Sequence, residues 1–404
     1  MGLVEIFQNK IWTIVFYSAI IILLYLNRKK FKFQGIMAIY RTKIGISLMD
    51  KWGKKYSRAI KILGFVGIVS GFLFMIVTLL LLLFGVFQFL TVKDAPPSVA
   101  PLLPGIDIPG SPINLPLVSG FIAIFIVIVV HEFAHGLVAR AYKIPVLSTG
   151  YVQMAIFPAA FVEPDEKKLS KSPTRVQLSL FAAGAFANVL FAIFALLLMI
   201  GFGYMAGSFV SANYETTGFS FEKIEPASPA ERANLLPDKV YTQVNGIPVN
   251  NATFAIGIFS KLKPGDTVKI GNDQITYEIE TVSNKLNSSK AFIGISGIKN
   301  NFVLKSYGLP IIFGAILLAI LMFISELLTW TLILNIAIGS VNMLPLGPID
   351  GGRMFLLASQ KIFGKNAGKK VWAGVSYSVL FIFIILLFQF ALIVGKAVLS
   401  SFAA

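Results

Sequence analysis

The stretch FIAIFIVIVVHEFAHGLVARAY, residues 121–142, decides the fold of this chain. Ten apolar residues in succession lead into two histidines and a glutamate. Counted from Pro116, the run exceeds the roughly 20 helical residues that cross a hydrocarbon core of about 30 Å. Ionisable side chains inside such a span are costly, and they indicate function by default. The stretch therefore predicts a membrane-spanning helix that carries a chemical site.

The composition of the whole chain supports a membrane protein. Of its 404 residues, 56% are hydrophobic and 13% are charged, against roughly 45–50% and 25% in soluble domains. These fractions exclude an ordinary soluble enzyme and a disordered chain. The chain has no cysteine, which excludes a disulfide scaffold, a zinc ribbon and a thiol nucleophile. The net charge of +16 predicts a positive cytoplasmic face rather than nucleic-acid binding, because the basic residues flank the apolar runs.

Further apolar runs of spanning length predict a polytopic α-helical membrane protein with about six transmembrane helices. A longer stretch, residues 307–346, holds two shorter runs separated near Ser325 and Glu326. Two complete crossings there would place the basic segment 353–370 outside, against the charge rule. We therefore expect residues 309–324 to be interfacial, re-entrant or one half of a long tilted helix. The other predicted spans are residues 11–26, 62–90, 116–142, 176–204 and 371–394.

Lysine and arginine set the predicted orientation. The segment 28–61 is densely basic and is placed in the cytoplasm, which leaves the N-terminus and residues 207–305 outside. His131 lies 15 residues after Pro116, or about 22 Å along a helix. We therefore expect a multi-pass membrane protein whose chemical site lies toward the cytoplasm, and we expect the membrane to be the plasma membrane of a prokaryote. The predicted domains are 1–115 (transmembrane helices and basic loop), 116–206 and 306–360 (two parts of a catalytic membrane core), 207–305 (an inserted extramembrane domain) and 361–404 (a C-terminal transmembrane helix).

The spacing of the two histidines is typical of a metal-binding motif. His131 and His135 are four residues apart, so both imidazoles lie on one helix face and can reach one ion. Glu132 projects beside them, where it can accept a proton from water. These histidines are the only two in the chain. The alternative is a hydrogen-bonded polar cluster that holds helices together.

A third ligand is expected, because catalytic zinc is usually held by three protein side chains. Without another histidine or a cysteine it must be a carboxylate, and Asp350 is the best candidate. It ends NMLPLGPID, residues 342–350, where Pro345 and Pro348 cannot continue a helix. Irregular backbone at membrane depth is tolerated around a polar cavity. Glu326 is a weaker candidate, since it should lie nearer the opposite face.

The paired motifs HEFAH (131–135) and NMLPLGPIDGG (342–352) resemble those of the site-2 proteases, a family of intramembrane zinc metalloproteases. The resemblance implies one zinc ion per chain, held by His131, His135 and Asp350, with Glu132 as the catalytic base. It implies regulated cleavage of transmembrane segments in membrane-anchored substrate proteins. A catalytically inactive membrane scaffold or transporter that retains the fold is the alternative function.

The same family carries a Gly-Pro-x-x-Asn pattern in the span after the HExxH helix. Here it is Gly184-Ala185-Phe186-Ala187-Asn188, with alanine in place of proline. The match implies that Asn188 contacts substrate or the oxyanion, and an interhelical hydrogen bond is an equal alternative. Asn335 and Asn342, seven residues apart, share a helix face and either orient the site or hold helices together.

Residues 145–162 are typical of short strands or a re-entrant hairpin. We expect Gly150, Tyr151 and Val152 to help present an edge to which substrate adds as a strand. The equal alternative is that the segment is only a cytoplasmic connector.

Residues 207–305 are polar and rich in turns. Ser228-Pro229-Ala230-Glu231 predicts a capped helix start, and Asn245-Gly246 predicts a hairpin turn. The segment resembles the α+β PDZ domains attached to bacterial-type proteases. That resemblance implies binding of peptides or substrate ends near residues 217–224, and a purely structural β domain is the alternative.

Overall fold

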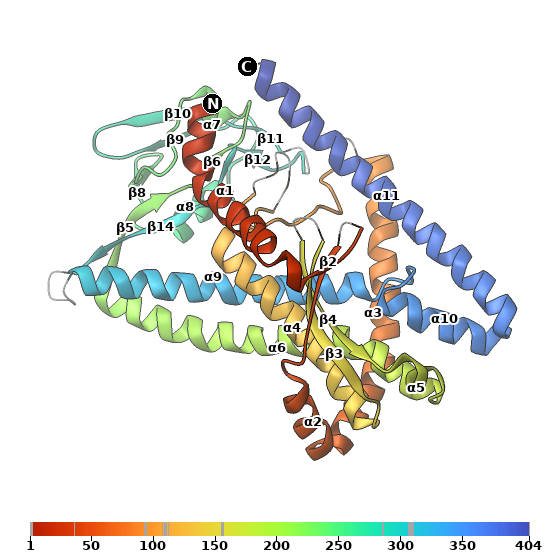
Figure 1. Ribbon diagram of the computed structural model, residues 1–404. Coiled ribbons are helices and arrows are strands. Elements are labelled where there is room, and N and C mark those ends of the chain that lie inside the picture. Colours follow the sequence, from red (N-terminus) through yellow and green to blue (C-terminus); the bar gives the residue numbers. More distant parts are fainter. Residues whose placement is uncertain are drawn as a thin grey trace. The chain divides into compact units, whose positions relative to one another are not determined.

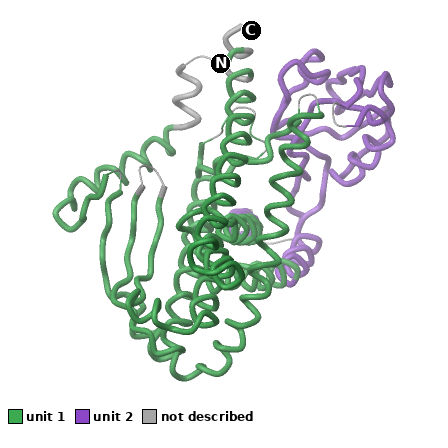
Figure 2. The backbone as a smooth tube through the Cα atoms, turned by 90° about the vertical axis from the view of Figure 1, so that its right-hand side faces the viewer, with its two compact units in different colours: residues 1–200, 323–404 green, residues 201–322 purple. Residues whose placement is uncertain are grey.

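The computed structural model describes residues 3–403, except residues 36, 93–94, 107, 109–110, 112, 155–156, 285–286 and 306–310. The chain forms two compact units (Figure 2). Unit 1 comprises residues 1–200 and 323–404, and unit 2 comprises residues 201–322. Helices α6 and α9 each contribute residues to both units.

Long apolar helices dominate the molecule (Figure 1). Within the described residues, five helices are long and apolar enough to cross a membrane. This confirms the predicted helical membrane architecture. The apolar part of α1, Ile11–Leu26, is shorter, so a sixth span remains a prediction. The long helices are α3 (Ser57–Thr91), α4 (Leu117–Ala141), α6 (Thr174–Asn213), α9 (Ile311–Asn342) and α11 (Lys365–Ala403), and α1 is Leu3–Leu26.

Helix α9 is continuous through Ser325 and Glu326. The described part of residues 309–324 is therefore one half of a single helix, which was one of the three predicted alternatives. Glu326 is compatible with a continuous helix, and its Oε1 accepts a hydrogen bond from Ser119 Oγ of α4 at 2.9 Å. A partnered carboxylate is far less costly in apolar surroundings than an isolated one.

A four-stranded antiparallel sheet lies beside the helices of unit 1. Its order is β1-β2-β3-β4, so β4 is an edge strand, which agrees with its two prolines. β3 and β4 pair as antiparallel strands, which confirms that residues 145–162, predicted to form short strands or a re-entrant hairpin, contain strands. The basic segment 28–61, predicted only as a loop, supplies β1, β2 and α2. The elements are the 3-10 turn Arg28–Lys30, β1 (Lys32–Gln34), β2 (Met37–Thr42), α2 (Ile46–Lys55), β3 (Val146–Met154) and β4 (Phe157–Pro164).

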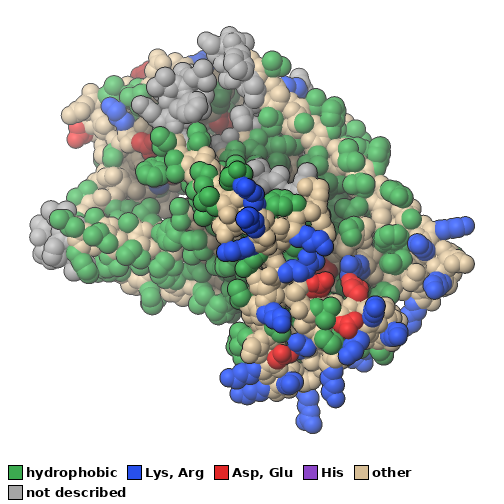
Figure 3. Space-filling view, in the orientation of Figure 1, with side chains coloured by type: hydrophobic (Ala, Val, Ile, Leu, Met, Phe, Trp, Pro, Cys, Tyr) green, Lys and Arg blue, Asp and Glu red, His purple; other side chains and the backbone are tan. Residues whose placement is uncertain are grey.

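Two short helices complete unit 1. α5 (Glu166–Ser170) follows β4, and α10 (Asp350–Phe363) follows an irregular segment after α9. Figure 3 shows lysine and arginine side chains gathered over the region of α2, α5 and α10, whereas the exposed side of α6 is largely hydrophobic. The basic side chains of α2, α5 and α10 thus lie at one end of unit 1.

Unit 2 is a small α+β domain with its own core. Phe219, Phe221 and Tyr241 are fully buried in it. Ser228 caps α7 by accepting from Glu231 N–H, as the sequence predicts. Its strands form one four-stranded sheet, β10-β9-β7-β8, and three two-stranded pairs. The elements are β5 (Tyr214–Ser220), β6 (Lys223–Ile224), α7 (Pro229–Arg232), β7 (Gln243–Val244), β8 (Ile247–Pro248), α8 (Ala252–Phe259), β9 (Thr267–Gly271), β10 (Thr276–Glu280), β11 (Val282–Ser283), β12 (Ala291–Phe292), β13 (Ile295–Ser296) and β14 (Lys299–Leu304).

Candidate metal centre and active site

Helix α4 presents both histidines on its buried face. His131 and His135 follow Ala123 and Val127 at intervals of four residues, and all four side chains are buried. Such spacing places side chains one above another on a helix. The small side chain of Ala123 and the fully buried Val127 keep this face inside the helix bundle. The periodicity of α4 therefore delivers both imidazoles to one place in the protein interior.

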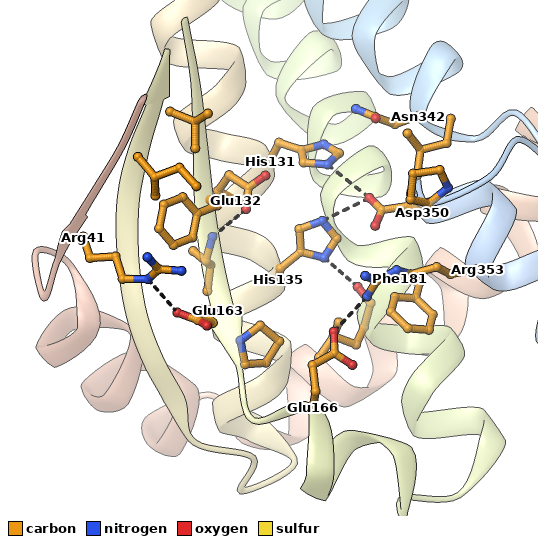
Figure 4. Close-up of a pocket in the computed structure, with 18 residues that line it drawn as sticks. Arg41, His131, Glu132, His135, Glu163, Glu166, Phe181, Asn342, Asp350 and Arg353 are labelled. Carbon is orange, nitrogen blue, oxygen red and sulfur yellow. Dashed lines mark hydrogen bonds and ion pairs between the residues drawn. The ribbon is translucent and has the colours of Figure 1, made fainter. Parts of the chain in front are cut away.

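Asp350 reaches the histidines from the first turn of α10 (Figure 4). Its Oδ2 lies 3.2 Å from His131 Nε2 and 3.1 Å from His135 Nε2. Two glycines follow it, and a Cβ on Gly351 would lie 2.3 Å from the carbonyl oxygen of Met343. The absence of side chains therefore lets the first turn of α10 pack against the irregular segment that precedes it, and this packing sets the position of Asp350.

Helix α6 packs closely against the histidine pair. The His135 Nδ1 atom lies 2.8 Å from the carbonyl oxygen of Leu180, and His131 Nδ1 lies 3.3 Å from the Asn188 amide nitrogen. Gly184 lies between these two positions, one turn from each. A Cβ there would lie 2.5 Å from the Nε2 atoms of both histidines. Only glycine allows α6 to approach the pair so closely.

The residues present fit a zinc ion. One ligand atom from each of His131, His135 and Asp350 lies within 4.8 Å of the others. Tetrahedral zinc bonds of about 2.0–2.2 Å separate two ligand atoms by roughly 3.3–3.5 Å. The two nitrogen-to-oxygen separations of 3.2 and 3.1 Å are close to that value. Two imidazole nitrogens and one carboxylate oxygen are the donor set of a catalytic zinc site that leaves one position open.

Glu132 connects this centre to the edge of the sheet. Its Oε2 accepts a hydrogen bond of 2.9 Å from the backbone N–H of Val162 in β4. The remaining carboxylate lone pairs stay available for water. The catalytic base predicted from the sequence and the hairpin predicted as a substrate edge are therefore in direct contact.

A cavity of about 470 Å³ opens beside these residues. Two ion pairs line it (Figure 4): Arg41 to Glu163 at 3.5 Å and Arg353 to Glu166 at 3.1 Å. Each arginine also lies over a phenylalanine ring of the cavity wall. The wall includes His131, Glu132, His135 and Asp350, together with the predicted candidates Asn342 and Val152.

The other predicted residues lie away from the cavity wall. Gly150 is in the inner strand β3, where a Cβ would lie 2.3 Å from the Tyr40 carbonyl oxygen, so it serves the packing of the sheet. The Tyr151 hydroxyl donates to Gln153. Asn335 is fully buried, and its amide nitrogen donates to the Thr331 carbonyl at 2.7 Å. Asn188 is likewise fully buried, beside His131.

Sequence reasoning missed several contributions to the site. The Val162 N–H and the Leu180 carbonyl are backbone groups, for which no side chain gives a signal. The two ion pairs join residues that are more than 100 positions apart in the chain. Gly184 was noted only as part of a motif, although its motif spacing to Asn188 could have indicated one shared helix face.

Comparison with known proteins identifies the family. The model for peptidase family M50 matches residues 119–387, about two thirds of the chain, and this range contains both histidines, Glu132 and Asp350. The chain belongs to peptidase family M50. This is the family of the site-2 proteases, which are membrane zinc metalloproteases, so the predicted resemblance is confirmed at the level of the family.

One related protein is similar to this chain over more residues than the family model matches. An uncharacterized protein of Methanocaldococcus jannaschii is 28% identical over 325 residues, covering 78% of this M50 chain and 76% of its own length. The similarity therefore includes most of both proteins.

Proposed function

We propose that this M50 protein is an intramembrane zinc endopeptidase that cleaves transmembrane segments of membrane-anchored proteins in regulated intramembrane proteolysis. The observation that carries the proposal is the convergence of His131, His135 and Asp350 beside Glu132, at a cavity walled by membrane helices and an edge strand. A scaffold or transporter would need neither this donor set nor a carboxylate placed next to it.

The residues divide the chemistry between them. His131, His135 and Asp350 would hold one zinc ion per chain, which when bound supplies Lewis acidity and lowers the pKa of water toward neutrality. Glu132 accepts the proton of the attacking water and later delivers it to the leaving nitrogen. The Val162 N–H holds the Glu132 carboxylate in place during both transfers. Such positioned acid–base catalysis contributes about 10²–10⁴-fold to a rate.

Strand β4 is the proposed binding edge for substrate. The Val162 N–H points out of the sheet toward Glu132 rather than toward β3. Because backbone direction alternates with a period of two, the N–H and C=O of Ala160 face the same side. A substrate segment that adds there as an extended strand brings its backbone past Glu132. A transmembrane helix satisfies its own backbone groups, so the substrate must first unwind locally.

The remaining partners follow from the predicted topology. The lipid bilayer surrounds the apolar helices, and the active site faces the cytoplasmic side of a prokaryotic plasma membrane. Unit 2 acts as a PDZ-like module that binds peptides or substrate ends. No nucleic-acid partner is proposed.

The test uses purified protein in detergent and a panel of single-span peptides. We expect the wild type to cleave within the apolar span of at least one peptide, while Glu132→Gln retains zinc and loses at least about 100-fold in rate. Glu280→Gln, an exposed change in unit 2 outside the predicted peptide-binding segment 217–224, is the matched control and keeps wild-type activity. Equal cleavage by wild type and Glu132→Gln would refute the proposal.

A further inference from the structure

We infer that Asn188 is a positioning residue for the metal centre: its side-chain oxygen accepts a hydrogen bond from His131 Nδ1–H and so holds the ring with Nε2 toward the metal. The inference rests on the proposed metal centre. It gives Asn188 a task different from the contact with substrate or oxyanion that its motif implies.

The two ring nitrogens of His131 have distinct surroundings. Nε2 lies 3.2 Å from Asp350 Oδ2 and faces the shared metal position, whereas Nδ1 lies 3.3 Å from the Asn188 amide. A nitrogen that binds a metal carries no proton, so the neutral ring carries its proton on the other nitrogen. His131 Nδ1 is therefore a donor and requires an acceptor.

His135 satisfies the same requirement on the same helix. Its Nδ1 lies 2.8 Å from the Leu180 carbonyl oxygen, which can only accept. Leu180 and Asn188 are eight residues apart on α6, so they lie on one face about two turns apart. The histidines are one turn apart on α4. Each imidazole thus meets one polar group of α6 at its Nδ1 atom, and for His135 that group is an acceptor.

The side chain of Asn188 can supply the missing acceptor. Its Oδ1 is buried and has no hydrogen-bond partner among the described residues. Rotation of the amide by half a turn exchanges its oxygen and nitrogen. In that orientation Oδ1 meets His131 Nδ1–H, and one hydrogen bond satisfies two buried groups that otherwise remain unpaired.

The location of Asn188 argues against direct contact with substrate. Its side chain is 0% exposed, and it is not among the residues that line the cavity beside Glu132. An oxyanion donor must lie about 2.7–3.1 Å from the reacting oxygen, which occupies that cavity. The side chain instead lies behind the His131 ring, where partners of metal ligands orient the ring and raise its basicity.

Zinc affinity of the full-length protein in detergent tests the inference, measured by competition with a chromophoric chelator. Asn188→Leu keeps the shape of the side chain and removes the hydrogen-bond acceptor. Asn188→Ala is a second variant that removes the acceptor. We expect both to weaken zinc binding about 10–100-fold. Asn188→Asp keeps an acceptor toward Nδ1–H, and we expect its affinity to equal or exceed that of the wild type.

Gln389→Ala is the matched control, since it removes another buried amide from a membrane helix away from the metal ligands. We expect it to bind zinc as the wild type does. Wild-type zinc affinity in Asn188→Leu, or in Asn188→Ala should the leucine variant not fold, would overturn the inference. The readout needs no substrate. A protein that shows the expected zinc pattern but cleaves nothing would refute the proposed function alone.

Discussion

Replacing Gly184 by alanine is expected to destroy the metal centre through a single methyl group. The added Cβ would lie 2.5 Å from His131 Nε2 and 2.5 Å from His135 Nε2, whereas ordinary contacts begin at 3.4 Å. Each ring, or helix α6 itself, must retreat by about 0.9 Å to relieve the overlap. Zinc–ligand distances tolerate only about ±0.2 Å. We therefore expect zinc affinity to fall at least about 100-fold, or roughly 2.8 kcal/mol.

The assay is zinc content of the purified protein by elemental analysis, followed by chelator competition. Gly203→Ala is the matched control, because it makes the same change in the same helix, and nothing lies within 4 Å of its added Cβ. We expect this variant to keep wild-type zinc affinity. A Gly184→Ala protein that binds one zinc ion as tightly as the wild type would refute the close approach of α6 to the histidine pair.

Four further changes test other parts of the structure. Asp350→Ala leaves two histidine ligands, so zinc affinity measured by chelator competition should fall at least about 100-fold; unchanged affinity would remove Asp350 from the centre. Stripping the metal should lower the melting temperature measured in detergent, because zinc at 1,000 times its Kd stabilises the folded state by about 4 kcal/mol; an unchanged temperature would contradict tight binding. Glu166→Gln breaks a pair whose side chains are 63% and 43% exposed, so unfolding free energy should change by less than about 1 kcal/mol; a larger loss would make the pair structurally important. Ser228→Ala removes the cap of α7 and should destabilise unit 2 by about 1 kcal/mol in denaturant unfolding; no change would mean that the helix end is held elsewhere.

Local signals in the sequence were sufficient to predict the membrane helices and to nominate the proposed metal ligands. Apolar runs longer than a bilayer is thick define α3, α4 and α6 without knowledge of their neighbours. The spacing of His131 and His135 determines their shared face from the helix period alone. Elimination shows only that the third ligand must be a carboxylate, because the chain offers no other histidine or cysteine. Asp350 was preferred over Glu326 because it follows the irregular segment with Pro345 and Pro348 and is expected at the depth of His131.

The contributions that could not be predicted are those that pair distant segments through the backbone. Strands β1 and β2 are short and carry exposed lysine and arginine, so the segment 28–61 shows charge more strongly than alternation. Strand β1 pairs with β2, and the pairing of β2 with β3 depends on residues more than 100 positions away. The contact of Val162 with Glu132 depends likewise on the hairpin folding back against α4. Such pairings follow from tertiary packing, which a periodicity argument does not contain.

The alanine at position 185 departs from the family pattern without disturbing the site. Proline would remove a backbone donor and fix one dihedral angle, and α6 runs unbroken from Thr174 to Asn213 without it. The groups of α6 that face the histidines are Leu180, Gly184 and Asn188, spaced by four residues on one face. Position 185 lies about 100° around the helix from position 184. The requirement on α6 is therefore a glycine at 184 with a polar group one turn to either side, and the buried Ala185 lies off that face.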